Sequence, residues 1–233
     1  MQIIPIKTRI FIEKENLFNF IIDNISSLDN GDVIAITSKI VALSQGRTGK
    51  IEDKNQTIIR SAKRTIETLW ALLTLTNDGW CINAGVDESN ANHKIILLPK
   101  DVFITAEKLR RDICRHFSLK KIGILITDTK SVPLRVGTIG RAMGFAGFEP
   151  LKSYIGKKDI FGKKSRFTES NIADALSASA VLNMGEGNEQ IPIVIIKDTP
   201  VRFTLKNNSR MKSSGLSISP EKDIFSFVYK NKK

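Results

Sequence analysis

The sequence predicts an α+β protein whose mixed sheets are flanked by helices. Apolar runs of strand length and stretches of helical spacing both occur, but they do not alternate regularly as they do in a doubly wound sheet. Asn77-Asp78-Gly79 is a strong signal for an antiparallel hairpin, because these residues tolerate the positive φ of tight turns. Of the 233 residues, 41% are hydrophobic and 26% are charged, which is typical of a globular protein.

The N-terminal part of the chain predicts two strands and two helices. Alternating apolar residues indicate a strand over residues 3–12. Apolar residues then recur at helical spacing from Leu17 to Leu28, and Asn30-Gly31 ends this helix. Residues 33–37 form an apolar run of strand length, and residues 57–63 predict a short helix.

The middle of the chain predicts the hairpin, a longer helix and a buried strand. The hairpin strands cover residues 69–75 and 80–83. Thr105 can cap a helix whose apolar stripe runs from Ala106 to Phe117. Residues 122–126 are then a buried strand that ends in Thr127-Asp128-Thr129.

The C-terminal part begins with many glycines between 137 and 147, which indicate backbone close to a neighbour or an irregular stretch. A basic loop, a helix, a core strand, a polar tail and a short terminal element follow, over residues 156–164, 172–182, 191–196, 207–217 and 223–229. We treat residues 1–233 as a single unit with an internal division near residues 100–105.

Charge and cysteine content narrow the location and the partners. The net charge of +12 attracts polyanions, which include nucleic acid, anionic lipid and phosphorylated small molecules. The start of the chain lacks the apolar region of a signal peptide, and no apolar run approaches the ~20 residues that cross a bilayer. Cys81 and Cys114 have neither disulfide-framework nor metal-ligand spacing, so we expect buried thiols and a cytoplasmic protein without a membrane partner.

The stretch from Asn83 to Asn90 is unusually rich in oxygen donors. It holds two carboxylates, two carboxamides, a hydroxyl and a glycine between two apolar runs. Such residues are ordinary in turns, but hard oxygen donors also suit Mg²⁺ or Mn²⁺. Asp87, Asp128 and Glu186 each stand where an apolar element ends, which favours a ligand site built from all three.

The chain contains five segments, between Ile4 and about Lys197, that resemble motifs of the coenzyme F420 γ-glutamyl ligase family in their residues and in their order. They read Gly31-Asp32-Val33 with Ser38-Lys39-Ile40-Val41 and Gly46-Arg47, Asn83 to Asn90, Thr127-Asp128-Thr129 with Pro133 and Arg135, Gly156 to Gly162, and Met184-Gly185-Glu186-Gly187. The resemblance implies GTP-dependent amide-bond formation. GTP would phosphorylate a carboxylate of an F420 precursor, and the amine of L-glutamate would attack the acyl phosphate.

The resemblance also implies the roles of individual residues. Asp87 and Asp128 would be catalytic and would hold one divalent ion, Mg²⁺ or Mn²⁺, while Thr129 and Glu186 would hold a second; potassium is a further candidate ion. Residues that border the guanine nucleotide would be Thr8, Arg9, Ile10, Phe11, Ser38, Lys39, Asn90, Met184, Gly185, Gly187, Asn188 and Gln190. Two intimately associated subdomains and a homodimer are implied as well.

Arginines are candidates for anionic contacts, because the guanidinium fork suits phosphate and carboxylate. We select Arg135 as a catalytic-centre contact and the pair Arg110-Arg111, with a structural ion pair as the alternative for Arg110. His93 and His116 are expected to be structural or exposed, since this chemistry needs no histidine.

Departures from the family pattern keep other functions open. Leu43 stands where the family commonly has lysine, which is an argument for a nucleotide-binding regulator without catalysis. Val132 stands where the family has arginine before Pro133, which indicates an altered acceptor such as a folate. A basic nucleic-acid-binding module explains the charge but neither the three carboxylates nor the presence of only two Trp and two Tyr residues, so we expect no nucleic-acid partner.

Overall fold

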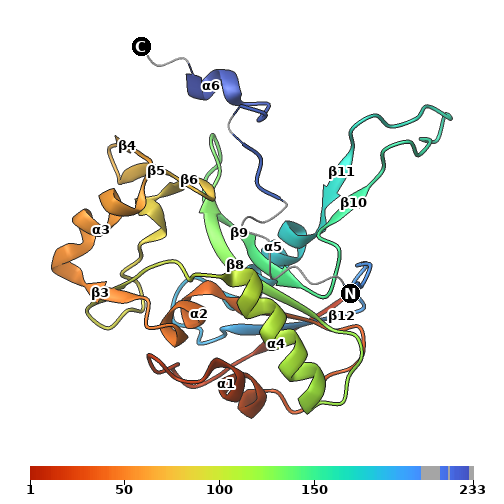
Figure 1. The fold of residues 1–233 in the computed structure, drawn as a ribbon, viewed down its shortest axis with the longest axis horizontal. Coiled ribbons are helices and arrows are strands. Elements are labelled where there is room, and N and C mark those ends of the chain that lie inside the picture. Colours follow the sequence, from red (N-terminus) through yellow and green to blue (C-terminus); the bar gives the residue numbers. More distant parts are fainter. Residues whose placement is uncertain (206–215, 220, 231–233) are drawn as a thin grey trace.

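The structure is a computed structural model that describes residues 1–205, 216–219 and 221–230 (Figure 1). It confirms the α+β class. A five-stranded mixed sheet in the order β1-β12-β2-β8-β9 forms its centre. The strands are β1 (Gln2–Ile6), β12 (Ile193–Lys197), β2 (Val33–Thr37), β8 (Gly123–Ser131) and β9 (Thr138–Ala146). Only β2 and β8 pair in parallel in this sheet; the other neighbours are antiparallel.

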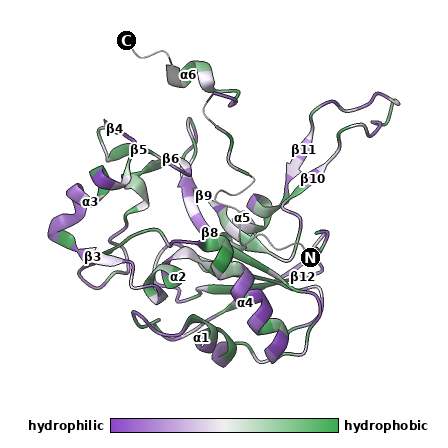
Figure 2. Ribbon diagram, in the orientation of Figure 1, coloured by the Kyte–Doolittle hydropathy of each residue, from purple (hydrophilic) through white to green (hydrophobic). Residues whose placement is uncertain are grey.

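Helices cover both faces of the central sheet, because its strands are apolar on both sides. The face with Ile34 and Ile124 packs against α1 (Leu17–Asn24), α2 (Ser38–Ser44) and α4 (Val102–His116). The face with Val33 and Leu125 packs against α5 (Ile172–Met184). In Figure 2, α1 and α4 mix hydrophilic with hydrophobic residues, as expected of helices that bury one face only.

Residues 48–96 form a smaller unit between α2 and α4, at the left of Figure 1. It holds two antiparallel sheets, β3 with β7 and β4-β5-β6, and a core around Ile58, Val86 and Ile95. The bounds are β3 (Thr48–Lys50), η1 (Ile51–Asp53), α3 (Lys54–Ser61), β4 (Arg64–Glu67), β5 (Leu72–Thr76), β6 (Gly79–Ile82), η2 (Asn83–Gly85) and β7 (Lys94–Ile96). The β5–β6 hairpin confirms the predicted turn; the division near residues 100–105 stays a prediction.

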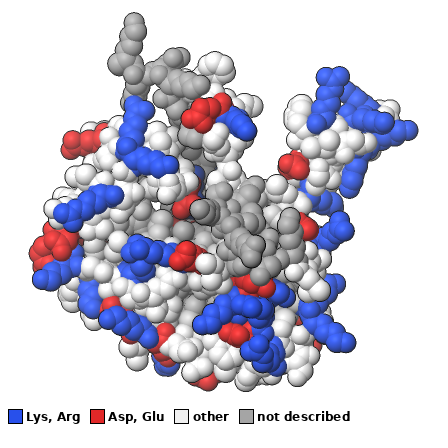
Figure 3. All heavy atoms as spheres, in the orientation of Figure 1, with Lys and Arg blue, Asp and Glu red and all other residues white. Residues whose placement is uncertain are grey.

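A long arm extends from the body between β10 (Leu151–Ser153) and β11 (Glu169–Asn171) (Figure 1). It contains the predicted basic loop, and Figure 3 shows a cluster of Lys and Arg side chains on it. Ile160, Phe161 and Phe167 on the arm are exposed. The arm therefore combines positive charge with apolar side chains that are exposed and lie outside the hydrophobic cores. The short helix α6 (Ser226–Lys230) confirms the terminal element.

Several local predictions were wrong. The first strand ends at Ile6 rather than residue 12, because the chain turns away and the Thr8 amide donates to the Gln190 carbonyl at 2.9 Å. Thr105 is no cap, since α4 begins three residues earlier, after Asp101. Both cysteines are half-buried rather than buried. Most of the polar tail predicted over residues 207–217 lies outside the described residues.

Candidate active site

The predicted site residues come from three places around the β2 and β8 strands. Because β2 and β8 are parallel, their carboxyl ends lie at one edge of the sheet, and Ser38 and Lys39 begin α2 directly after β2. The buried part of β8 ends at Thr127, so Asp128 stands where the apolar run ends, as predicted, although the strand itself continues to Ser131. Glu186 follows the end of α5.

Asp87 is fixed by backbone and side-chain contacts. Its backbone pairs with that of Ile96, the last residue of β7. The Lys39 ammonium lies 2.9 Å from Asp87 Oδ2 and donates to Ser89 Oγ at 2.6 Å, and the Ser89 amide donates to Asp87 Oδ1 at 2.8 Å. Burial alone would raise the pKa of Asp87, but the bonds from Lys39 and Ser89 outweigh it and lower the pKa.

Asp128 lies beside α2 and β9. The Ser38 hydroxyl donates to its Oδ1 at 3.2 Å, and the Arg141 guanidinium lies 3.7 Å from its Oδ2. Burial raises the pKa of Asp128, and Arg141, the Thr129 amide and Ser38 offset only part of this effect. The negative charge of Asp87 raises the pKa of Asp128 further, so these two carboxylates are within electrostatic reach of each other.

Glu186 joins the same cluster. Burial raises the pKa of Glu186; Lys39 lowers it, and the charges of Asp128, Asp87 and Glu189 raise it again. The three predicted carboxylates therefore lie within electrostatic reach of one another, and Lys39 acts on Asp87 and Glu186. Such a concentration of negative charge, only partly compensated, is favourable for a bound cation.

Two hydrogen bonds join the segments predicted to border the nucleotide. Asn90 Nδ2 donates to the Gly187 carbonyl at 3.0 Å, and the Thr8 amide donates to the Gln190 carbonyl. Segments that are distant in the sequence thus meet beside Glu186. The turn after α5 depends on Gly185, whose φ of 76° suits glycine and where a Cβ would overlap the Glu189 carboxylate.

The side chains of the predicted N-terminal nucleotide segment have different environments. Arg9 forms an ion pair with Glu15 and lies over the Phe20 ring. Ile10 is exposed, whereas Phe11 is buried with its ring centroid 4.9 Å from that of Phe20. Phe11 could therefore border a ligand through its backbone only.

The donors near the carboxylates fit hard divalent cations in their chemistry, since they are carboxylate and hydroxyl oxygens. Strand alternation places the Thr129 side chain on the face that α5 covers, opposite Asp128. Among the described residues, no three His, Cys, Asp or Glu side chains are grouped so that they could hold a metal ion as they stand. Metal binding stays a prediction.

Two predicted arginine contacts lie away from the carboxylates. Arg135 is exposed in the tip between β8 and β9, and Asp128 is three residues, about 10 Å of strand, before the end of β8. Arg110 forms the structural ion pair that was the alternative prediction, with two hydrogen bonds to the Glu107 carboxylate at 2.7 and 3.1 Å. Arg111 is exposed. Both histidines are exposed, as expected.

Sequence reasoning missed Arg141 and Lys130. Arg141 lies directly across the sheet from Asp128, and Lys130 follows Asp128 by two residues on the same strand. Burial and the charge of Arg141 lower the pKa of Lys130. The i, i+2 spacing of Asp128 and Lys130 was a visible signal, but the pairing with Arg141 depends on the β8–β9 register.

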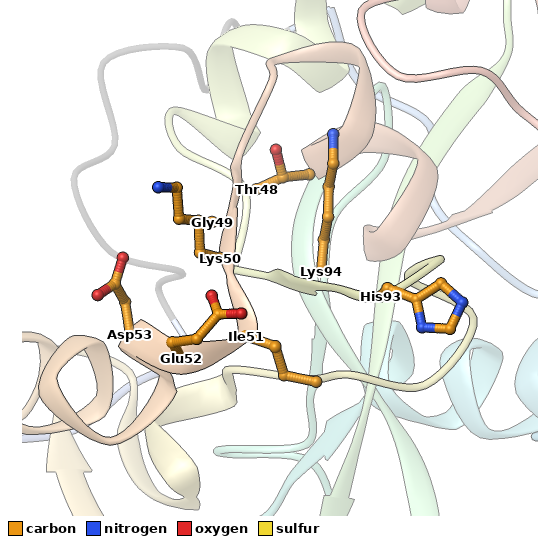
Figure 4. A pocket seen from close by; sticks show the side chains of 8 residues that line it. All are labelled: Thr48, Gly49, Lys50, Ile51, Glu52, Asp53, His93 and Lys94. Carbon is orange, nitrogen blue, oxygen red and sulfur yellow. The ribbon is translucent and has the colours of Figure 1, made fainter.

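An open groove lies elsewhere on the protein. Its volume is about 770 Å³, and it is lined by Thr48 to Asp53, His93 and Lys94 (Figure 4). None of the three carboxylates lines this groove, and the Lys94 ammonium is bound to Glu13 at 2.6 Å. We therefore define the candidate site by the three carboxylates, Lys39 and Arg141, and not by this groove.

Comparison with known proteins first gives the class, which is that of ligases. A coenzyme F420:L-glutamate ligase of Methanosarcina mazei is 35% identical over 206 residues, which cover 79% of this chain and 80% of the relative. The same-named protein of Methanocaldococcus jannaschii is 33% identical over 85% of this chain and 86% of the relative. A third, from Methanococcus maripaludis, is 43% identical over 57% of this chain and 54% of the relative.

The particular family follows from the family model. The model described as F420-0:Gamma-glutamyl ligase matches residues 5–57 and 49–198. The chain belongs to this family. The resemblance seen in the five motifs is thereby confirmed, and the matched residues include Asp87, Asp128 and Glu186.

Proposed function

We propose that this protein is a γ-glutamyl ligase that joins L-glutamate to a terminal carboxylate of a coenzyme F420 precursor, with GTP as the phosphoryl donor. The observation that carries this proposal is that Asp87, Asp128 and Glu186, from three distant parts of a chain that belongs to the ligase family, lie within electrostatic reach of one another.

The proposed reaction has two steps. An oxygen of the acceptor carboxylate attacks the γ-phosphorus of GTP, the bond to the β,γ-bridging oxygen breaks, and GDP leaves. The glutamate nitrogen then attacks the acyl carbon, phosphate leaves and the nitrogen loses a proton. Phosphorylation is needed because a carboxylate has no adequate leaving group of its own.

The carboxylates would hold two divalent cations, Mg²⁺ or Mn²⁺. We assign Asp87 and Asp128 to one ion and Thr129 with Glu186 to the other, and potassium remains a further candidate. These ions would supply neutralisation of the charge that gathers on the phosphoryl group during transfer. The opposite faces of Asp128 and Thr129 on β8 support the division into two positions.

The nucleotide is proposed to lie beside Glu186. Its neighbours would be Thr8 to Phe11, Ser38, Lys39, Asn90 and the turn from Met184 to Gln190. The bonds of Asn90 to Gly187 and of Thr8 to Gln190 support this position, because they hold these segments against one another. Lys39 would offer its ammonium to a phosphate oxygen.

We further propose a homodimer with small-molecule substrates only. The exposed apolar side chains on the arm between β10 and β11 support a second copy as the partner, since apolar side chains in such number on one projecting segment favour contact with protein. In the described part of the chain, no helix is long and apolar enough to span a membrane. A cytoplasmic location remains our expectation.

Mass spectrometry of the products tests the proposal. Purified protein is incubated with L-glutamate, GTP, MnCl₂ and either an F420 precursor or a folate, and a mass gain of one glutamyl residue is expected with the F420 precursor. Glutamylation of the folate alone would show that the acceptor is a folate and not the F420 precursor, while the ligation chemistry would stand. Absence of glutamylation and GTP hydrolysis with every acceptor would refute the proposal.

Asp128→Asn is the matching variant. It should abolish turnover, because the neutral amide removes the negative charge that would bind the proposed cation, and it should change the melting temperature little. Asp23→Asn, on the exposed surface of α1, is the control and should leave the rate unchanged. An unchanged rate in Asp128→Asn would remove this residue from the catalytic centre.

A further inference from the structure

Asp128, Lys130 and Arg141 share one face of the β8–β9 ribbon. In the antiparallel register Asp128 lies opposite Arg141, and Lys130 is two residues further along β8. Residues opposite each other, and residues two apart on one strand, point to the same face. The other face is covered by α5, where a Cβ at Gly140 would meet Ser177 and Val181.

Arg141 is half-buried and has only long polar contacts. Its side chain is only 16% exposed, yet its contacts are long, at 3.7 Å to Asp128 Oδ2 and 3.4 Å to the Asp78 carbonyl. Charge-assisted bonds between guanidinium and carboxylate are normally about 2.7–2.9 Å. Arg141 Nε is buried and has no hydrogen-bond acceptor among the described residues. A guanidinium in this situation lacks an anion that uses its planar fork.

Lys130 adds a second cation beside Arg141. Its Nζ lies 4.0 Å from the position that a Cβ at Gly79 would take, so it points to the β5–β6 turn. No described carboxylate lies within ion-pair distance of this ammonium. Arg141 also reaches that turn through Asp78. Two cations without a close anionic partner therefore lie where the β8–β9 ribbon meets the β5–β6 hairpin.

We propose that Lys130 and Arg141 form an oxyanion subsite that binds a phosphate or carboxylate group of the acceptor. This subsite would lie next to the place beside Asp128 where the acceptor's own carboxylate reacts. The assignment to the acceptor rests on the proposed ligase function. The nucleotide segments lie near Glu186 and Asn90, whereas Lys130 lies about 7 Å further along β8 toward the hairpin tip. An acceptor that reacts at Asp128 would extend its remaining anionic groups in this direction.

Binding of inorganic phosphate tests the subsite without any ligase reaction. Isothermal titration with phosphate, and separately with L-glutamate as a carboxylate, is carried out on the full chain and on Lys130→Met, Arg141→Lys and Lys108→Met. Lys108 is an exposed cation on α4 and serves as the matched control. Arg141→Lys keeps the charge but loses the fork. Circular dichroism melting verifies that each variant is folded.

We expect Lys130→Met and Arg141→Lys to weaken phosphate binding about ten- to a hundredfold, the worth of one or two charge-assisted bonds, while Lys108→Met binds as the wild type does. A similar loss for L-glutamate alone would identify a carboxylate rather than a phosphate as the bound group. Equal binding of both anions by all four proteins would overturn the proposal.

Steady-state kinetics give a second readout where ligation is observed. The KM for the acceptor should rise about tenfold in Lys130→Met, with the KM for GTP changed less than twofold, because uniform binding of the acceptor is lost. An equal rise in both KM values would overturn the assignment to the acceptor. If no acceptor is glutamylated, the ligase proposal fails, but the phosphate titration still decides the subsite.

Discussion

The ion pair between Glu107 and Arg110 allows a sharp test of how burial sets the worth of a salt bridge. Helix α4 carries two pairs with the same i, i+3 spacing. Glu107 and Arg110 are 3% and 11% exposed and 2.7 Å apart, whereas Asp112 and Arg115 are 27% and 81% exposed and 3.4 Å apart. The substitutions Glu107→Gln and Asp112→Asn each remove one negative charge at nearly constant volume.

The two substitutions should differ strongly in free energy of unfolding. Removing one partner of a buried pair leaves an uncompensated charge and costs about 3–5 kcal/mol. We take about 3 kcal/mol for Glu107→Gln, because Arg110 keeps some solvent contact and the amide still accepts one hydrogen bond. An exposed pair contributes at most about 1 kcal/mol, and Asp112→Asn should cost less than about 0.5 kcal/mol.

Thermal unfolding followed by circular dichroism measures this difference. For a chain of this size, 1 kcal/mol corresponds to about 2–4 °C, so Glu107→Gln should lower Tm by roughly 6–12 °C and Asp112→Asn by less than about 2 °C. Arg110→Lys should also lower Tm, with the substrate KM unchanged at 25 °C. Similar small shifts for both acidic variants would refute the reasoning, and a raised KM in Arg110→Lys would make Arg110 a substrate contact.

Two further predictions concern a turn and a pH dependence. Gly185→Ala should lower stability by about 1–2 kcal/mol and weaken GTP binding, because the backbone at this residue has a positive φ and the added Cβ would overlap the Glu189 carboxylate. Gly137 also has a positive φ, but no atom lies near its Cβ position. Gly137→Ala should therefore cost about 1 kcal/mol and leave GTP binding unchanged. Hydrogen bonds from Lys94 and Thr48 lower the pKa of Glu13 in the folded protein. The contribution of Glu13 to the free energy of unfolding is therefore present above the ordinary carboxyl pKa and is lost as the pH falls through the lowered pKa. Glu13→Gln should therefore cost about 0.5 kcal/mol at pH 7 and less at pH 3 in urea titrations, with exposed Glu52→Gln as the control, and a constant cost at both pH values would contradict this assignment.

Elements whose signals are local in the sequence were predictable. The strand over residues 33–37 was correct to the residue, since all of its apolar side chains enter one of the two cores. The Asn77-Asp78-Gly79 turn was correct because tight hairpins depend on local φ preferences. The first strand was not, because alternation continues past Ile6 while the bond of Thr8 to Gln190, made by the far end of the chain, redirects the backbone.

The candidate site was predictable to the extent that its residues lie in compact motifs. Asp87, Asp128 and Glu186 could be selected because each belongs to such a motif, and in the structure they lie within electrostatic reach of one another. Arg141 lies in a glycine-rich stretch without a recognisable signal, and only the strand register brings it to Asp128. Arg135 was selected by its motif, but the motif does not reveal that it lies at an exposed hairpin tip.

The two hydrogen bonds that join the segments proposed to border the nucleotide also limit when the site can form during synthesis. Asn90 and Gly187 are 97 residues apart, and Thr8 meets Gln190 across most of the chain. Loops of this length close late, after local hairpins and helices. A nascent chain that ends before Gln190 also lacks β12, so it could pair only β2, β8 and β9 of the central sheet. The proposed nucleotide site would therefore first form when ribosomes release the C-terminal part.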